Sequence, residues 1–423
     1  MRQSFLAVAT TVLLCVVSTP ALSVDVSVLY DKPSIAVMPL LHDGEVLFQD
    51  YSKGSYRLYV LPIDGGGKSE VYNSGTTYLH PLDFGGSHAA WIGYTSGGAG
   101  GGLFKSTGPV VPGGPGAGAS YFVKGIAVNA ESATNLAGDG AYKEHVAVDG
   151  NRVVWTDYRH FSAGDTTVEV YFYDFAANKE SRLTDHNGYK ANPAVQGDYI
   201  VWADYRNTSS DKHNADIFLY DLSNNDEKPI CTEPGYQDQP CVNGHLVVWQ
   251  DYRNADSDGK NADIYLYDLS KEEEKPICTA QGYQCYPKIY GGLVVWHDYR
   301  NAGSDSKNAD IYYYDLSTGS EGEVTLKSGY QGSPDLYGEY VVWQDYTDNK
   351  IYVGHFGEVT AVRPAARSVD IAGPHRSNAA AVTCFDIRGR HVPSRPQEAR
   401  GTGVMTRRFN GTARMFLRGA RSW

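Results

Sequence analysis

Residues 246–268 read LVVWQDYRNADSDGKNADIYLYD, and this stretch decides the fold. Two runs rich in valine, leucine and tyrosine flank a polar loop, a pattern that predicts two short β-strands. The tryptophan of this stretch recurs every 47 residues along the chain, at Trp155, Trp202, Trp249, Trp296 and Trp343. Repetition on this scale indicates one structural unit that is used several times.

The period defines seven units. The repeated text reads VVWTDYRH, IVWADYRN, VVWQDYRN, VVWHDYRN and VVWQDYTD, and Trp91 and Phe48 fill the tryptophan position in two earlier units. Turn signals divide the fifth unit into four predicted strands: Gln239–Val242, Leu246–Asp251, Ala262–Asp268 and Lys275–Thr279. Four strands in a repeat of about 40–50 residues predict a β-propeller blade. A β-solenoid would use shorter repeats, and a helical array would lack the valine-rich and tyrosine-rich strands.

The two ends of the repeat region predict how the ring closes. Val26–Tyr30 aligns with the outer strand of a unit, whereas the last unit runs out after its third strand, Lys350–Phe356. We therefore expect an all-β, seven-bladed propeller over residues 24–357, in which the N-terminal strand completes the seventh blade. Closure of this kind leaves no open sheet edge within the ring.

Composition agrees with this fold and excludes some functions. The 423 residues include 46 Gly, 32 Tyr and 7 Trp, which favours strands and turns over helices. The net charge of −12 argues against a general nucleic-acid binder. Residues 358–423 carry twelve Arg, no Lys and four acidic residues, so an acidic propeller precedes a basic tail.

The N-terminus predicts export. Arg2, the apolar run Phe5–Val17 and the small residues around Ala21 make residues 1–23 a secretory signal peptide. The apolar run is too short to span a membrane, and no second run of about 18 residues follows, so no membrane span is expected in the mature chain. We therefore expect a secreted or cell-surface protein.

Export permits disulfide bonds among the cysteines. Crossing a four-stranded blade covers about 14 Å, too far for a bridge between Cys231 and Cys241. This favours a bridge between Cys241 and Cys285, on neighbouring inner strands.

The repeat text resembles a known family. The pattern VVWQDYRN…DIYLYDL…KPICT is similar to the TolB-like propeller repeats of exported and cell-surface proteins, over about residues 24–357. The resemblance implies the propeller fold. It does not choose a function, because such propellers serve both binding and catalysis.

The tail resembles a second family. After an expected linker at residues 358–378, residues 379–423 contain CFDIRGRHV and MTRRFNGTARMFLRG, whose alternation predicts a small antiparallel β module resembling a sandwich. The module resembles the C-terminal sorting domain of type IX secretion, which implies the secretion machinery as a partner. An unrelated β appendage or a frayed basic tail is the alternative.

Repeated tyrosines mark a candidate binding face. A tyrosine precedes the tryptophan position by thirteen residues in six units: Tyr78, Tyr142, Tyr189, Tyr236, Tyr283 and Tyr330. These ring tyrosines, if they reach the channel entrance, would stack on sugars or grip a peptide, so the expected ligand is a polysaccharide or a surface protein. The alternative, which repetition favours, is that each tyrosine packs against the neighbouring blade.

The loop of the fifth unit suggests a cation. Oxygen side chains alternate before Gly259, which suits calcium, although the bidentate glutamate of a calcium-binding hand is missing. The candidate ligands are Asn254, Asp256, Asp258 and Asp263. No nucleotide-binding or zinc motif is found.

An enzyme is the second hypothesis. Certain propeller-fold polysaccharide lyases use His and Tyr to abstract a proton, and the similar residues here are Tyr78, His80, Tyr142 and His145. Lys143 or Lys190 could neutralise a uronate carboxylate. The Gly- and Pro-rich insertion at residues 96–118 would hang over the same face as a lid or as a disordered insertion.

A repeated Asp–Arg pair is interpreted as structural. In the five units whose tryptophans are 47 residues apart, Asp lies two residues after the tryptophan, and in four of them Arg lies four residues after it. A group that recurs in four blades suits a strut better than a catalytic role. We expect the arginines to pair with Asp216, Asp263 and Asp310.

Overall fold

The repeated tryptophans lie between neighbouring blades. Trp155, Trp202, Trp249 and Trp296 are fully buried, and each stacks on an aromatic residue of the next strand, as Trp249 does on Tyr265 with ring centroids 6.2 Å apart. The core around Trp249 also takes Val201 and Leu219 from the preceding blade. Hydrophobic burial therefore joins each blade to the next.

The computed structural model describes residues 22–31, 36–75, 77, 79–95, 120–162, 167–208, 214–255, 261–302 and 308–357, with four short strands between residues 384 and 417. Within these residues every element is a strand or a turn, and no helix long and apolar enough to cross a membrane is found. The signal-peptide prediction and the proposed lid fall outside them.

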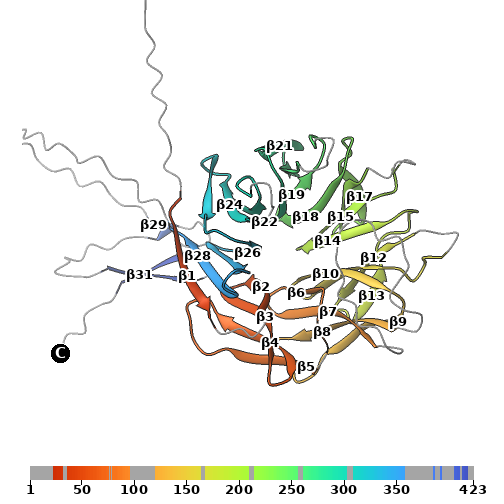
Figure 1. Ribbon diagram of the computed structural model, residues 1–423, viewed down its shortest axis with the longest axis horizontal. Helices are drawn as coiled ribbons and strands as arrows, with labels where there is room; N and C mark the ends of the chain where they lie inside the picture. Colours follow the sequence, from red (N-terminus) through yellow and green to blue (C-terminus); the bar gives the residue numbers. More distant parts are fainter. Residues whose placement is uncertain are drawn as a thin grey trace, which may run out of the picture. The chain divides into compact units, whose positions relative to one another are not determined.

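Seven four-stranded antiparallel sheets form the propeller, with their first strands around the centre (Figure 1). The first two blades contain β2 (Ala36–His42), β3 (Glu45–Ser52), β4 (Ser55–Pro62), β5 (Ser69–Gly75), β6 (Leu82–Phe84), β7 (His88–Thr95), β8 (Ser120–Ala127) and β9 (Thr134–Gly140). The next two contain β10 (Lys143–Asp149), β11 (Arg152–Asp157), β12 (Glu169–Asp174), β13 (Lys179–Arg182), β14 (Lys190–Gln196), β15 (Tyr199–Asp204), β16 (Asp216–Asp221) and β17 (Asp226–Cys231). The last three contain β18 (Gln237–Asn243), β19 (Leu246–Asp251), β20 (Asp263–Asp268), β21 (Glu273–Cys278), β22 (Gln284–Tyr290), β23 (Leu293–Asp298), β24 (Asp310–Asp315), β25 (Ser320–Thr325), β26 (Gln331–Tyr337), β27 (Tyr340–Asp345), β28 (Lys350–Phe356) and β1 (Val24–Tyr30).

The N-terminal strand closes the ring, as predicted. Strand β1 pairs antiparallel with β28, with Val24 opposite Phe356 and Val28 opposite Tyr352. The predicted strands of the fifth unit also agree with the structure, since their ends differ by at most two residues. The fold is an all-β, seven-bladed propeller.

The Asp–Arg pairs form struts, but not with the expected partners. Asp251 is fully buried and accepts hydrogen bonds from Trp249 Nε1 at 2.8 Å and from Arg253 Nη2 at 2.7 Å. The guanidinium lies over the Tyr265 ring and reaches Glu274 on the outer strand at 2.7 Å. The expectation that the arginines pair with Asp216, Asp263 and Asp310 is wrong, because Asn side chains occupy those three carboxylates: Asn207, Asn254 and Asn301.

The expected disulfide is also absent from the described residues. Cys231, Cys241, Cys278 and Cys285 are all free thiols, so the predicted Cys241–Cys285 bridge is wrong. The two residues lie at different levels of their inner strands. Cys241 pairs with Val248, one residue before the tryptophan of its blade, whereas Cys285 pairs with His297, one residue after it.

The chain divides into two units, residues 1–360 and 361–423. The second unit contains two antiparallel strand pairs: β29 (Cys384–Phe385) with β30 (His391–Val392), and β31 (Val404–Phe409) with β32 (Thr412–Leu417).

Candidate functional site

The repeated tyrosines and the loops beside them lie on one face of the propeller. In the fifth blade Gln237 at the start of β18 pairs with Asp251 at the end of β19, which in turn pairs with Asp263 at the start of β20. The loops around these residues therefore emerge together. Tyr252 N donates to the carbonyl of Tyr236 at 2.8 Å, which brings two tyrosines of each such blade side by side. We call this end of the blades the tyrosine face.

The tyrosines of this face form a continuous belt across five blades. Ring tyrosines alternate with the tyrosine three residues after each tryptophan, and successive ring centroids lie 4.8–6.2 Å apart. In order, the belt runs through Tyr142, Tyr158, Tyr189, Tyr205, Tyr236, Tyr252, Tyr283, Tyr299, Tyr330 and Tyr346. Tyr78 lies outside the described residues.

Hydroxyl contacts lock the belt between blades. The hydroxyls of Tyr205 and Tyr236 lie 2.5 Å apart, and those of Tyr252 and Tyr283 lie 2.6 Å apart. Burial raises the pKa of Tyr252 to about 12, so its hydroxyl stays protonated near neutral pH. These ring tyrosines are half-buried joints between blades, which is the packing role that the repetition favoured.

Two carboxylates lie within the belt. Glu144 accepts hydrogen bonds from the hydroxyls of Tyr142, Tyr158 and Tyr189 at 2.6, 2.8 and 2.9 Å. In the fifth blade Asp238 accepts from Tyr236 at 3.0 Å and from Asn192 Nδ2 at 2.6 Å. Both carboxylates make this face acidic.

Sequence reasoning missed a second ring of residues. In six inner strands the residue ten positions before the tryptophan position is not glycine, yet it has φ between 48° and 53°: Met38, His145, Asn192, Gln239, Tyr286 and Ser333. Register shifts between neighbouring ladder pairs mark β-bulges at these positions. The sequence did mark these positions as variable. In GYKANP, GYQDQP, GYQCYP and GYQGSP the two residues before the proline differ in every unit.

Three of the bulges, those at Met38, Tyr286 and Ser333, are held by a side-chain acceptor on the preceding blade. Gln250 Oε1 accepts from Tyr286 N at 3.2 Å, and His297 Nε2 accepts from Ser333 N at 2.6 Å. Burial lowers the pKa of His297 to about 3, so this imidazole remains a neutral acceptor. The backbone at the mouth is therefore fixed while its side chains differ from blade to blade.

Tyr286, which lies outside the belt, and Tyr346, the last member of the belt, are more exposed than the other nine belt tyrosines. Tyr286 is 43% exposed and Tyr346 is 42% exposed, on the sixth and seventh blades. His297 packs against Tyr286 with centroids 5.4 Å apart, and Ser333 Oγ lies 3.1 Å from the Tyr346 hydroxyl. Tyr286 and Tyr346 are called here the open tyrosine pair. Together with the Ser333 hydroxyl they form an open aromatic and hydroxyl surface.

The inner strands also place charges below the bulges. Lys288 Nζ lies 3.7 Å from Asp335 Oδ1. Asp83 accepts a hydrogen bond from Val148 N at 2.7 Å, and burial raises its pKa to about 6. The described charges at this level are two carboxylates and one ammonium.

The residues of the enzyme hypothesis are only partly brought together. His145 Nδ1 lies 3.8 Å from Glu144, and burial lowers the pKa of both His145 and His80. The side chains of Lys143 and Lys190 are fully buried instead. Lys143 lies 3.3 Å from Asp157, and Lys190 lies 3.8 Å from Glu169, so neither ammonium is free to meet a ligand.

Two of the four candidate calcium ligands, Asn254 and Asp263, lie within the described residues. Asp256 and Asp258 lie outside the described residues. Asn254 Nδ2 donates to Asp263 Oδ2 at 2.9 Å, so an amide N–H occupies the carboxylate oxygen that a cation would need. Among the described residues no group of three or more His, Cys, Asp or Glu side chains is arranged to hold a metal ion.

Solved structures share the fold. The chain is similar to an oligogalacturonate lyase in complex with manganese, at 12% identity and a TM-score of 0.51, over 79% of this chain and 91% of that chain. An oligogalacturonate lyase from Vibrio parahaemolyticus has 9% identity and a TM-score of 0.54, over 80% of this chain and 98% of that chain. The β-propeller domain of the Trilobed protease from Pyrococcus furiosus has 11% identity and a TM-score of 0.53, over 77% of this chain and 95% of that chain. The sequence matches no protein-family model and no curated protein. At these identities the likeness shows the propeller fold.

Proposed function

We propose that this propeller is an exported binding module that holds carbohydrate on its tyrosine face. The observation that carries the proposal is the open tyrosine pair, two exposed aromatic rings beside a serine hydroxyl on a rigid belt. Aromatic faces stack on sugar rings, and nearby hydroxyls supply hydrogen bonds. A protein loop is the other ligand that suits such a surface.

The carboxylates on the tyrosine face favour a neutral glycan over an anionic one as the ligand. Glu144 and Asp238 lie in the belt, and the two candidate lysines are buried against carboxylates. An anionic polysaccharide would meet like charge here, and desolvating unpaired charges is costly.

Export and family membership are part of the same proposal. The signal-like residues 1–23, the TolB-like repeat text and the FDIRGR-containing tail support a secreted or surface protein that meets a type IX secretion machinery. Calcium at the loop of the fifth blade has the support of its alternating oxygen residues alone.

Affinity electrophoresis on neutral and uronate-containing polysaccharides tests the binding. We expect retardation by a neutral glycan and at least about tenfold weaker retention for the Tyr286→Ala/Tyr346→Ala double variant, since each stacked ring contributes roughly 1 kcal/mol. Tyr94→Ala is the matched control, because Tyr94 is 40% exposed at the corresponding position of the second blade. Unchanged retention in the double variant would refute the proposal.

A polysaccharide lyase is the second candidate, favoured by the contact of His145 with Glu144 and by the fold shared with oligogalacturonate lyases. Its test is near-ultraviolet absorbance of unsaturated uronate products on a panel of anionic glycans. Activity that His145→Ala abolishes would establish it. No absorbance change on any anionic glycan would remove it.

A further inference from the structure

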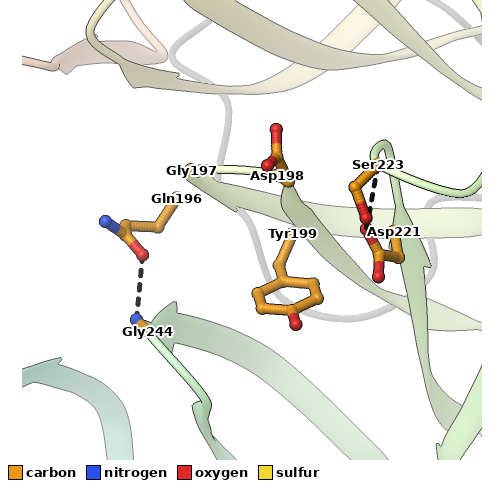
Figure 2. Close-up of a pocket in the computed structure, with 7 residues that line it drawn as sticks. All are labelled: Gln196, Gly197, Asp198, Tyr199, Asp221, Ser223 and Gly244. Carbon is orange, nitrogen blue, oxygen red and sulfur yellow. Dashed lines mark hydrogen bonds between the residues drawn. The ribbon is translucent and has the colours of Figure 1, made fainter.

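A pocket of about 220 Å³ lies at the other end of the strands, between the fourth and fifth blades (Figure 2). Its lining residues are Gln196, Gly197, Asp198, Tyr199, Asp221, Ser223 and Gly244. The volume is below the roughly 300–1,000 Å³ of typical small-molecule sites, so it suits a single side chain.

The pocket combines an aromatic ring with a carboxylate that has spare capacity. Tyr199 on β15 pairs directly with Asp221 on β16, and Figure 2 shows the ring between Gln196 and Asp221. Ser223 donates from its N and its Oγ, at 2.9 and 2.6 Å, and both bonds go to Asp221 Oδ1. Among the described residues no donor reaches Oδ2. Gln196 uses its Oε1 to accept from Gly244 N at 2.8 Å, which leaves its amide N–H groups available.

The seventh blade shows what such a tyrosine holds elsewhere in this molecule. Tyr340 occupies the place of Tyr199, and its cross-strand partner is His355. The imidazole lies against the Tyr340 ring, with centroids 4.6 Å apart and planes 35° apart. Its Nε2 lies 3.6 Å from Glu339 Oε2. His355 takes the strand position of Asp221, so in the seventh blade a planar nitrogen heterocycle, and not a carboxylate, packs against the tyrosine ring beside a carboxylate.

The fifth blade shows what the carboxylate holds. Asp268 occupies the place of Asp221, and Lys271 Nζ donates to its Oδ2 at 2.6 Å. Among the described residues of the fourth blade, no such cation contacts Asp221. The Arg152 guanidinium is bound to Asp198 at 2.8 Å and to the carbonyl of Gly197, both of which line the pocket.

We propose that this pocket binds an arginine side chain of a partner protein. The guanidinium stacks on Tyr199 and donates to Asp221 Oδ2, a combination of cation–π and charge-assisted contacts that suits arginine better than lysine. The Gln196 side chain is an uncharged amide and adds no competing positive charge. This site is independent of the tyrosine face, and it would make the propeller a scaffold with a ligand on one face and a protein partner on the other.

Calorimetry with N-acetyl-arginine amide and its neutral isostere N-acetyl-citrulline amide tests the pocket in the full chain. We expect the arginine probe to bind measurably and the citrulline probe at least about tenfold more weakly, because the citrulline probe lacks the charge. Equal binding of the two probes, or no binding of the arginine probe at millimolar concentration, would overturn the proposal.

The variant Tyr199→Leu locates the binding. Leucine is the residue at this position in the fifth and sixth blades, Leu246 and Leu293, so the repeat already accommodates it. We expect at least about fivefold weaker arginine binding in this variant, and no change in Tyr340→Leu, where His355 already covers the ring. Unchanged affinity in Tyr199→Leu would refute the assignment. The contrast between the two probes in the unmodified chain stands even if a variant misfolds.

Discussion

Gly332 lies on the tyrosine face at a place where three aromatic or imidazole rings leave little room for a side chain. A Cβ atom there would lie 2.9 Å from Tyr330 Cε1, 3.1 Å from His297 Cε1 and 3.2 Å from Tyr346 Cε2. We expect Gly332→Ala to lower the free energy of unfolding by roughly 1–3 kcal/mol through overpacking, measured by urea denaturation. Gly292→Ala is the control, because nothing lies within 4 Å of its Cβ position. Equal stability of the two variants would contradict this prediction.

We expect the stability of the fold to depend on pH through the buried carboxyl group of Asp83. Burial raises its folded-state pKa to about 6, above the unfolded value of about 3.9, so the folded chain retains a proton that the unfolded chain has lost between those values. Its contribution to stability is therefore complete below about pH 4 and is lost as the pH rises through 6.

Asp83→Asn should remove this dependence. The amide oxygen can still accept from Val148 N, and the variant should be more stable than the parent at pH 7 by roughly 1 kcal/mol. Thermal unfolding of both proteins between pH 4 and 8 is the measurement. A difference between the two that does not change with pH would show that Asp83 does not titrate in this window.

At the scale of the element, one strut ties the second strand of a blade to its loop and outer strand. Asp251→Ala leaves the buried Trp249 N–H and the Arg253 guanidinium without their acceptor, so we expect a loss of about 3–5 kcal/mol in urea unfolding. Glu274→Gln removes the outer, 26% exposed partner of Arg253 and should cost less than about 1 kcal/mol. A small effect in both would mean that stacking on Tyr265 alone holds the arginine.

The strands were largely predictable from sequence because local residue patterns determine the structure of each blade. The tryptophan period, the valine-rich strands and the turn residues all act within one unit, and even the closing strand could be recognised by alignment to its equivalents. The bulges could not be predicted in the same way, since the left-handed backbone at Met38, Tyr286 and Ser333 is held by acceptors on the neighbouring blade rather than set by the residue itself.

The site was predicted only in part for the same reason. The ring tyrosines were found on the expected face, but their hydroxyls meet across blades, as in Tyr252 and Tyr283. The arginine partners were wrong because Asn254, nine residues before Asp263 in sequence, reaches that carboxylate first. The Tyr252–Tyr283 contact depends on a distance between blades that a single repeat does not contain, whereas the Asn254–Asp263 contact lies within one repeat and depends on how its loop folds back.

At the scale of the whole molecule, ring closure rests on one strand. Deleting Val24–Tyr30 leaves β28 as an open edge, so we expect a lower melting temperature and concentration-dependent association, measured by calorimetry and light scattering. The control is Val26→Thr/Val28→Thr, since both valines are 44% exposed and threonine is equally suited to a strand. A deletion variant that melts like the parent and remains monomeric would show that the ring does not need this closure.

The bulged inner strands make the mouth of the ring a surface that can change by single substitutions. Six positions share one backbone conformation while carrying six different side chains, from Met38 to Ser333. Exchanging a side chain there leaves the ladder and the interblade acceptors in place. New ligand preferences can therefore arise one blade at a time, during evolution or in a designed library, without a new fold.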